Sequence, residues 1–322
     1  MRKFLIGILI SSIFIGVLAY KFDYNEFSKL WSKINYSYLA LAYFSQLLGV
    51  VLFSVRWYYL LGGELKFKHC ISSSFIGYGA NMVLPARGGD LFRVYYCRQE
   101  SGLQFLSVLS KLFIEKVIDF LYVILTGIIS YMLLRMGNQN AGSFTIFTVS
   151  GTIVIGILVS LYLLRFKLEW ILKLLVQIAS KIGKEKFYKD HVEANLIELS
   201  EFLKFKNFTK PLLMTVITWF AYISTYLIIS YMLEIKISVQ ELVFILFCGA
   251  MSLAVPSAPS GIGVFHASVI SAFLLLGKDE NDGLVFATAI HLISFIALTT
   301  SGLVFYLFWT YRRRHAGKPL IE

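Results

Sequence analysis

The residues best suited to chemistry lie in a short charged stretch between two apolar segments. Arg87 and Arg93 flank Asp90, with Pro85 just before them and Gly89 between them. A guanidinium binds phosphate oxygens through two parallel hydrogen bonds, and a neighbouring carboxylate can orient it. This spacing predicts that one or both arginines hold a phosphate group while Asp90 orients one of them. The alternative is an ordinary membrane flank with an internal ion pair.

Two further acids follow at helical spacing. Glu115 and Asp119 are four residues apart and therefore share one helix face, with Lys111 one turn before them. An acid this close to an apolar run is costly unless it is paired. The pair is expected either to counter the arginines structurally or to contact a cationic headgroup or a proton.

A second candidate stretch is glycine-rich and uncharged. Pro259, Gly261 and Gly263 precede His266, and His291 lies in the next uncharged run. A histidine at membrane depth is a functional candidate, with a hydrogen-bonded packing role as the equal alternative. No spacing in the chain indicates a metal site, and neither a metal nor a cofactor is expected.

The composition indicates a chain whose solvent is lipid. Of its 322 residues, 57% are hydrophobic and 15% are charged, against roughly 25% charged residues in ordinary soluble domains. Its three cysteines are few and widely separated, so no disulfide framework is expected. The chain contains no Walker loop, no H-E-x-x-H and no G-x-S-x-G. Soluble enzymes are therefore largely excluded.

A helix needs about 20 apolar residues to cross a bilayer. The first uncharged run resembles a signal sequence, but its end at Leu18, Ala19 and Tyr20 is a poor cleavage site, which favours a retained anchor helix. The uncharged runs expected to cross are 4–20, 34–55, 120–134, 136–164, 211–233 and 283–311.

Two uncharged runs do not fit single crossings. The run 71–86 is short, contains Asn81 and ends at Pro85, and the run 242–277 is interrupted at 255–263 by prolines and glycines. Irregular backbone at membrane depth must be buried in protein or line a cavity. We therefore expect one all-α polytopic domain over 1–322, with six crossings and two broken re-entrant hairpins of opposite orientation that face a central cavity. If the hairpins cross, the domain has eight helices.

The basic residues predict the orientation, because cytoplasmic loops carry an excess of Lys and Arg. In the topology with cytoplasmic termini in the cell (inner) membrane, only a few of the 30 Lys and Arg residues lie outside. The net charge of +11 then reflects orientation and attraction to anionic headgroups rather than nucleic-acid binding. The segment 166–207 has the pattern of a cytoplasmic interfacial helix, or of a linker between halves. The six outside residues are Lys21, Lys29, Lys33, Arg135, Lys236 and Lys278.

The two breaks resemble each other. In each, a glycine follows a proline by four residues, Gly89 after Pro85 and Gly263 after Pro259. Inverted repeats of transporters place such broken helices near the midplane, where free helix N-termini attract anions. The second set of candidates, Pro259, Gly261 and Gly263, is therefore predicted to share the lipid phosphate with the first.

Three motifs together resemble the lysylphosphatidylglycerol synthase transmembrane-domain family of flippase-like proteins. The resemblance covers nearly the whole chain. The motifs are Asn81-x3-Pro85-x-Arg87-x-Gly89-Asp90-x2-Arg93, then Glu115-x3-Asp119, then Pro256-x2-Pro259-x-Gly261-x-Gly263-Val264.

The resemblance implies a role in lipid movement. Members are similar to the membrane half of the multiple peptide resistance factor, which moves aminoacylated phosphatidylglycerol between leaflets, and others are linked to polyprenyl or hopanoid lipids and surface glycans. The chain departs from the family at Asp90, where Glu is usual, and at His266, where an acid is frequent. It ends at Glu322 without room for an aminoacyl-transferase domain, so synthesis of the lysyl-lipid is not expected.

The leading prediction is translocation of an anionic phospholipid or a polyprenyl-phosphate-linked lipid between leaflets. An integral-membrane glycosyltransferase or related transferase, with Asp90, Glu115 or Asp119 as base, is the first alternative. A non-catalytic partner of a separate lipid-modifying or glycan-synthesis enzyme is the second. Transport is favoured because the irregular backbone at the two breaks lies in opposed hairpins. A transferase would be expected to carry paired acids in a long extramembrane loop.

Overall fold

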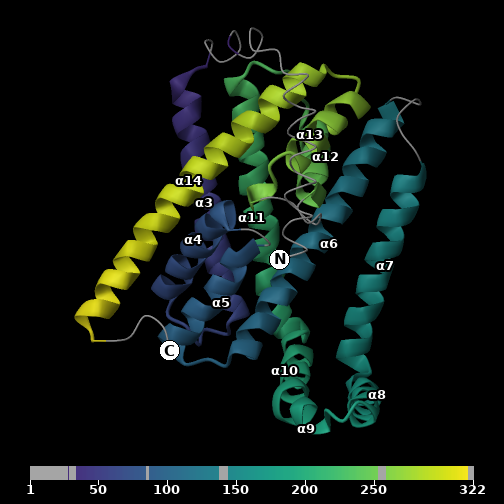
Figure 1. Ribbon diagram of the computed structural model, residues 1–322. Helices are drawn as coiled ribbons and strands as arrows, with labels where there is room; N and C mark the ends of the chain where they lie inside the picture. Colours follow the sequence, from purple (N-terminus) through teal and green to yellow (C-terminus); the bar gives the residue numbers. More distant parts are fainter. Residues whose placement is uncertain (1–27, 29–33, 85–86, 138–143, 253–258, 318–322) are drawn as a thin grey trace.

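The computed structural model describes residues 28, 34–84, 87–137, 144–252 and 259–317, and every regular element in these ranges is helical (Figure 1). α7 (Phe144–Phe166) has 23 residues, about 35 Å of helix, and runs beside α6. The expected first crossing, 4–20, lies outside the described residues. Within the described ranges, four helices contain stretches long and apolar enough to cross a membrane, namely α3 (Tyr36–Leu60), α6 (Phe105–Gly137), α11 (Phe205–Met232) and α14 (Glu280–His315).

Two hairpins lie between the long helices. The first consists of α4 (Phe67–Val83) and α5 (Gly88–Ser101), and the second of α12 (Val239–Ser252) and α13 (Val264–Leu275). These helices have 17, 14, 14 and 12 residues, and at 1.5 Å per residue none spans the roughly 30 Å of a hydrocarbon core. In Figure 1 the hairpins start from opposite ends of the bundle and turn back about halfway. The predicted re-entrant hairpins of opposite orientation are thus confirmed.

Left-handed backbone marks both breaks. Arg87, the residue before α5, has φ +56°, and in the second break Ser260 and Gly263 have φ +57° and +87°. An L-residue avoids this region in a continuing helix. The chain therefore stops one helix and starts another at each break, in a short 3₁₀ turn at Pro259–Gly261 in the second. The centres of the breaks, 85–86 and 253–258, lie outside the described residues.

Each hairpin has its own apolar core. The main cluster around the first hairpin comes from α3, α4, α5 and α6, with smaller clusters against α14, and that around the second comes from α3, α6, α7, α11, α12, α13 and α14. The two cores bury different residue types. The first includes Trp57, Leu60, Cys70, Val94 and Ile114, and the second includes Phe244, Phe247, Phe265, Phe273 and Phe286.

Backbone contact fixes the first hairpin against α14. A Cβ added to Gly79 of α4 would lie 2.5 Å from the carbonyl oxygen of Leu298, and a Cβ added to Gly302 would lie 2.8 Å from that of Phe75. Only glycines allow so close a crossing, as in other membrane helix pairs. α4 also contacts the Pro259–Gly261 turn. The breaks of the two hairpins are therefore neighbours.

α6 begins earlier than the uncharged run predicts. The expected crossing was 120–134, whereas α6 starts at Phe105 and includes Lys111, Glu115, Lys116 and Asp119. The helix tolerates these charges because neighbouring helices supply partners for them, which a count of uncharged residues cannot register.

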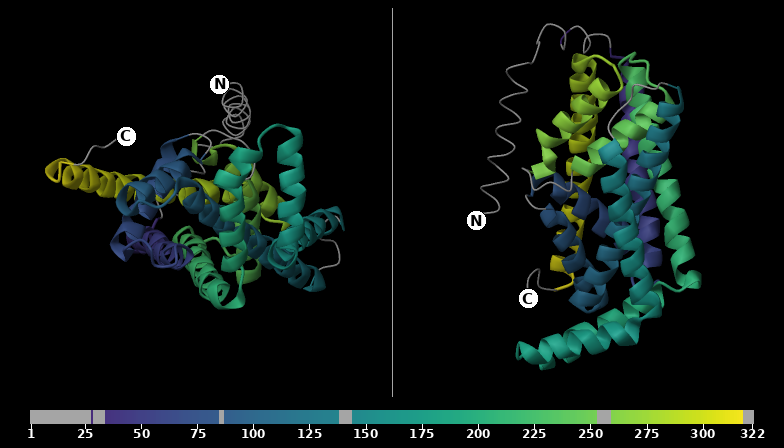
Figure 2. Two further views of the ribbon diagram at one scale, coloured as in Figure 1. Left: turned by 90° about the horizontal axis from the view of Figure 1, so that it is seen from below. Right: turned by 90° about the vertical axis from the view of Figure 1, so that its right-hand side faces the viewer.

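One end of the bundle carries a helical connection between α7 and α11. It consists of α8 (Leu168–Lys181), α9 (Glu185–Tyr188), a π-helical turn (Lys189–Glu193) and α10 (Ala194–Phe202). α8 extends sideways from the bundle (Figure 2). At the other end, Asp279 caps α14 by accepting hydrogen bonds from the amides of Asn281 and Asp282. The acidic turn before α14 therefore begins a helix.

Candidate functional site

A buried ion pair joins the first hairpin to α6. The guanidinium of Arg93 on α5 donates from Nη1 and Nη2 to the two carboxylate oxygens of Glu115 at 2.7 and 2.9 Å. Their side chains are 1% and 0% exposed. The guanidinium also lies 3.9 Å from the centre of the Trp57 ring on α3. Two-point pairing of this kind compensates much of the cost of burying both charges.

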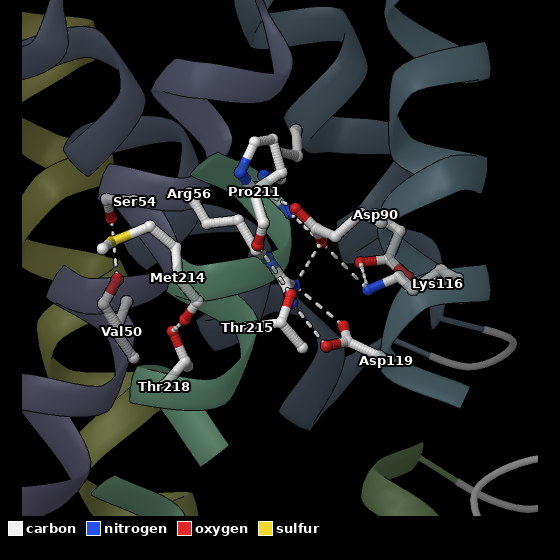
Figure 3. A network of polar contacts seen from close by, with 12 residues as sticks. Val50, Ser54, Arg56, Asp90, Lys116, Asp119, Pro211, Met214, Thr215 and Thr218 are labelled. Atoms are coloured by element: carbon white, nitrogen blue, oxygen red, sulfur yellow. Dashed lines mark hydrogen bonds and ion pairs between the residues drawn. The ribbon is translucent and has the colours of Figure 1, made fainter. Parts of the chain in front are cut away.

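A second arginine pairs with the next acid along α6. Arg56 of α3 donates to the two oxygens of Asp119 at 2.5 and 2.8 Å and to the Thr215 hydroxyl at 3.0 Å, as Figure 3 shows. The Trp219 indole N–H donates to Asp119 at 3.0 Å. Arg56 is also 3.8 Å from Glu115. The two ion pairs therefore form one network that connects α3, α5, α6 and α11.

The network continues to the break of the first hairpin. The Lys116 amine lies 3.4 Å from the Asp90 carboxylate (Figure 3), and the Arg87 Nε lies 3.7 Å from its other oxygen. The Asn81 amide donates to Asp90 at 3.0 Å and accepts from the Asp90 backbone N–H at 3.2 Å. This arrangement holds the carboxylate against α4 while two cations approach it.

Exposure increases along this network. The side chains of Arg56 and Glu115 are 0% exposed, that of Lys116 is 27% exposed and that of Arg87 is 51% exposed. The network carries four positive and three negative formal charges, so one positive charge has no matching acid within it. The surplus lies where an anion can reach it, at Arg87 and Lys116. The four cations are Arg56, Arg87, Arg93 and Lys116, and the three acids are Asp90, Glu115 and Asp119.

The second break contains a histidine pair. His266 of α13 and His291 of α14 have ring centres 5.2 Å apart, and His291 Nε2 lies 2.9 Å from the Ser260 hydroxyl. The Nδ1 atom of His266 is buried and has no hydrogen-bond partner among the described residues. This break therefore presents imidazoles and a hydroxyl, whereas the first presents arginine, lysine and a carboxylate.

The predicted glycines have packing roles. A Cβ on Gly89 would lie 2.0 Å from the backbone oxygen of Gly77, so Gly89 allows α5 to contact α4. Gly261 and Gly263 both have positive φ and form the turn that follows Pro259. Their predicted contact with a lipid phosphate stays a prediction.

Lys111 lies apart from the acids with which it shares a helix. Its amine contacts Glu198 of α10 at 2.7 Å and Glu64 at 3.8 Å. It therefore joins α6 to the connection between α7 and α11. In the described part of the chain, no group of three or more His, Cys, Asp or Glu residues is arranged to hold a metal ion.

Two residues of the network, Arg56 and Lys116, were not predicted as site residues from the sequence. Arg56 and Lys116 entered the prediction only among the basic residues assigned to the cytoplasmic side. The signal for Arg56 was its place directly after 22 uncharged residues, where a long helix continues. The signal for Lys116 was its position between two acids on the helix that carries the site.

The sequence comparisons agree with this architecture. The model of the family described as "Lysylphosphatidylglycerol synthase TM region" matches residues 4–302. The UPF0104 membrane protein MJ1078 of Methanocaldococcus jannaschii is 24% identical over 246 residues, which cover 75% of this chain and 98% of that protein. The UPF0104 membrane protein MJ1595 of the same organism is 28% identical over 122 residues, which cover 36% of this chain and 36% of that protein.

No solved structure matches the chain. The family match extends from the first predicted crossing into α14 and includes both hairpins and all seven charged residues of the network. The chain therefore belongs to the lysylphosphatidylglycerol synthase transmembrane-region family.

Proposed function

We propose that this membrane protein moves an anionic lipid, either a phospholipid or a polyprenyl-phosphate-linked lipid, between leaflets. Arg87 and Lys116 contact the headgroup phosphate at the break of the first hairpin. The observation that carries the proposal is the unmatched positive charge at a half-crossing hairpin, where Arg87 is 51% exposed and Asp90 is shared between two cations.

A charged side chain at membrane depth costs free energy. An unmatched cation there is expensive, and a phosphate monoanion that replaces part of its hydration lowers this cost. Arg93 and Arg56 already use both terminal nitrogens on carboxylates. They hold the hairpin in place, and Arg87 and Lys116 bind the lipid.

The opposed hairpins support transport. Their breaks are neighbours approached from opposite ends of the bundle, which is the arrangement expected for access from either leaflet. We place the end that carries α8 in the cytoplasm of the cell, because the topology predicted from the sequence assigns all but six of the 30 Lys and Arg residues to that side.

The transferase alternative needs a free base. Glu115 and Asp119 each accept two hydrogen bonds from one guanidinium, so both oxygens of each carboxylate already have a partner. Asp90 is the remaining acid of the network, and Asn81 and Lys116 contact it. This arrangement favours a site that binds a charge over one that transfers a proton.

Transport by the purified protein in liposomes tests the proposal. The protein should move a fluorescent anionic phospholipid or polyprenyl-phosphate lipid across the bilayer without any nucleotide sugar. Arg87→Ala should slow this movement at least about tenfold, because a charge-assisted contact is worth about 1.5 to 3 kcal/mol. Arg87→Lys should recover part of the rate, since an ammonium lacks the planar fork.

Arg98→Ala is the matched control, because Arg98 is an exposed arginine on the same helix and should leave the rate unchanged. If the Arg87→Ala protein is folded and moves lipid at the wild-type rate, the phosphate site does not lie at the first break. A wild-type protein that moves no anionic lipid but converts a lipid-phosphate sugar donor would establish the transferase instead.

A further inference from the structure

The helix α8 has a row of large apolar side chains that the described part of the chain leaves exposed. Trp170, Leu174, Ile178 and Ile182 follow one another at intervals of four residues and are 57%, 40%, 47% and 62% exposed. Residues four apart lie on the same side of a helix. The row therefore forms one stripe along the whole of α8.

The opposite side of α8 is occupied by the rest of the connection. Ala179 and Tyr188 are 6% and 5% exposed, and the Tyr188 hydroxyl donates to the backbone oxygen of Leu172 at 3.4 Å. α8 also contacts α9 and α10. The helix thus has two apolar sides, and the described residues cover one of them.

The stripe continues an exposed aromatic surface of α7. Tyr162 and Phe166, the last aromatic residues of α7, are 54% and 64% exposed and have ring centres 5.0 Å apart. Phe166 is four residues before Trp170, and only Lys167 separates α7 from α8. The chain therefore enters α8 directly after the predicted crossing 136–164, where the membrane surface is expected.

The direction of α8 fits that level. Figure 1 shows α8 nearly end-on beneath the bundle, and the right-hand view of Figure 2 shows it lengthwise and across the bundle axis. Lys167, Lys173 and Lys181 are exposed on the helix, against one exposed acid, Glu169. A long lysine side chain can keep its amine at the headgroups while its stem lies along apolar surface.

We propose that the exposed stripe of α8 binds the anionic lipid surface of the membrane that the protein spans. Trp170, Leu174, Ile178 and Ile182 enter the boundary between headgroups and acyl chains, and the lysines contact lipid phosphates. The connection between the halves is thereby fixed to one leaflet. This inference does not depend on which lipid the protein moves.

The test uses the full-length protein in lipid nanodiscs, with single cysteines at Leu174→Cys in the stripe and Gln177→Cys on the polar side. Both positions are exposed, whereas Cys70 and Cys97 are buried and Cys248 is replaced by alanine. Discs of phosphatidylcholine with phosphatidylglycerol should slow labelling at position 174 by a water-soluble maleimide about tenfold relative to 177, since burying a leucine is worth about 1.5 kcal/mol or more.

A second arm tests the charge. The triple change of Lys167, Lys173 and Lys181 to glutamine should remove most of the extra protection that phosphatidylglycerol gives over phosphatidylcholine alone. Equal labelling at 174 and 177 in anionic discs would overturn the proposal. Protection that appears in native membranes but not in discs would also overturn it and would assign the stripe to a protein partner.

Discussion

Both hairpins are interrupted by left-handed backbone, but the side chains at the two breaks differ in chemistry. The first is tied to α6 by Arg93–Glu115 and ends beside Arg87 and Asp90, while Arg56–Asp119 joins the neighbouring helices α3 and α6. The second is surrounded by phenylalanines and ends beside two histidines and a serine. The charged side chains therefore gather at the first break, whereas apolar packing surrounds the second.

The largest expected effect comes from breaking the buried pair at the first hairpin. Glu115→Ala leaves Arg93 charged, buried and without its partner, which should lower the free energy of unfolding by about 3 to 5 kcal/mol. Thermal unfolding in detergent should show a large fall in melting temperature. The double change Arg93→Met and Glu115→Leu should recover much of the loss, because it removes both charges. An unchanged melting temperature for Glu115→Ala would show that the pair does not hold the hairpin.

The next effect concerns the backbone crossing between α4 and α14. Gly79→Ala places a Cβ 2.5 Å from the Leu298 carbonyl oxygen and should cost about 1 to 3 kcal/mol through strain. Gly156→Ala on α7 is the control, since nothing lies within 4 Å of the added atom, and it should stabilise the helix slightly. Equal melting temperatures for the two variants would contradict the tight crossing.

A smaller effect on folding should follow Asp90→Asn, together with a clear effect on transport. The asparagine can still accept from Asn81, so stability should fall by only about 1 kcal/mol, while Arg87 and Lys116 lose the charge that orients them. Lipid movement should slow several-fold. Glu64→Gln, at an exposed acid 3.8 Å from Lys111, is the control and should transport normally. If Asp90→Asn transports as well as this control, Asp90 does not position the cations.

The smallest effect should come from the second break. His291→Leu removes the hydrogen bond to Ser260 and fills the position of the ring with an apolar side chain. It should lower the free energy of unfolding by about 0.5 to 1.5 kcal/mol. Transport of anionic lipid should fall much less than in Arg87→Ala. A larger fall in the histidine variant would reverse the comparison and place the decisive contact at the second break.

Several features of the fold were predictable because they depend on local composition. Uncharged runs identify the crossings, and prolines and glycines at 85–89 and 255–263 identify the breaks, since a proline removes a backbone donor and a glycine permits left-handed backbone. The four-residue spacing of Glu115 and Asp119 likewise predicts a shared helix face. Each of these inferences concerns residues close together in the chain.

Which charges pair with which could not be read from local patterns. The spacing predicted that one or both of Arg87 and Arg93 hold a phosphate, and it did not indicate that the Arg93 guanidinium pairs with Glu115, 22 residues further along the chain. Arg56 and Asp119 are 63 residues apart, and His266 and His291 are 25 residues apart. Such contacts depend on how helices cross, and close crossings such as that at Gly79 are set by side-chain volume on two helices at once.

By itself the sequence determined that this chain enters lipid, where its helices break and which end carries most of its lysines, because hydropathy, backbone preference and charge act residue by residue. Only the tertiary structure decided which arginines form buried ion pairs with acids and which remain exposed at the break. The physical reason is that a buried charge is stable only beside a partner. That partner can come from any helix that the packing brings near.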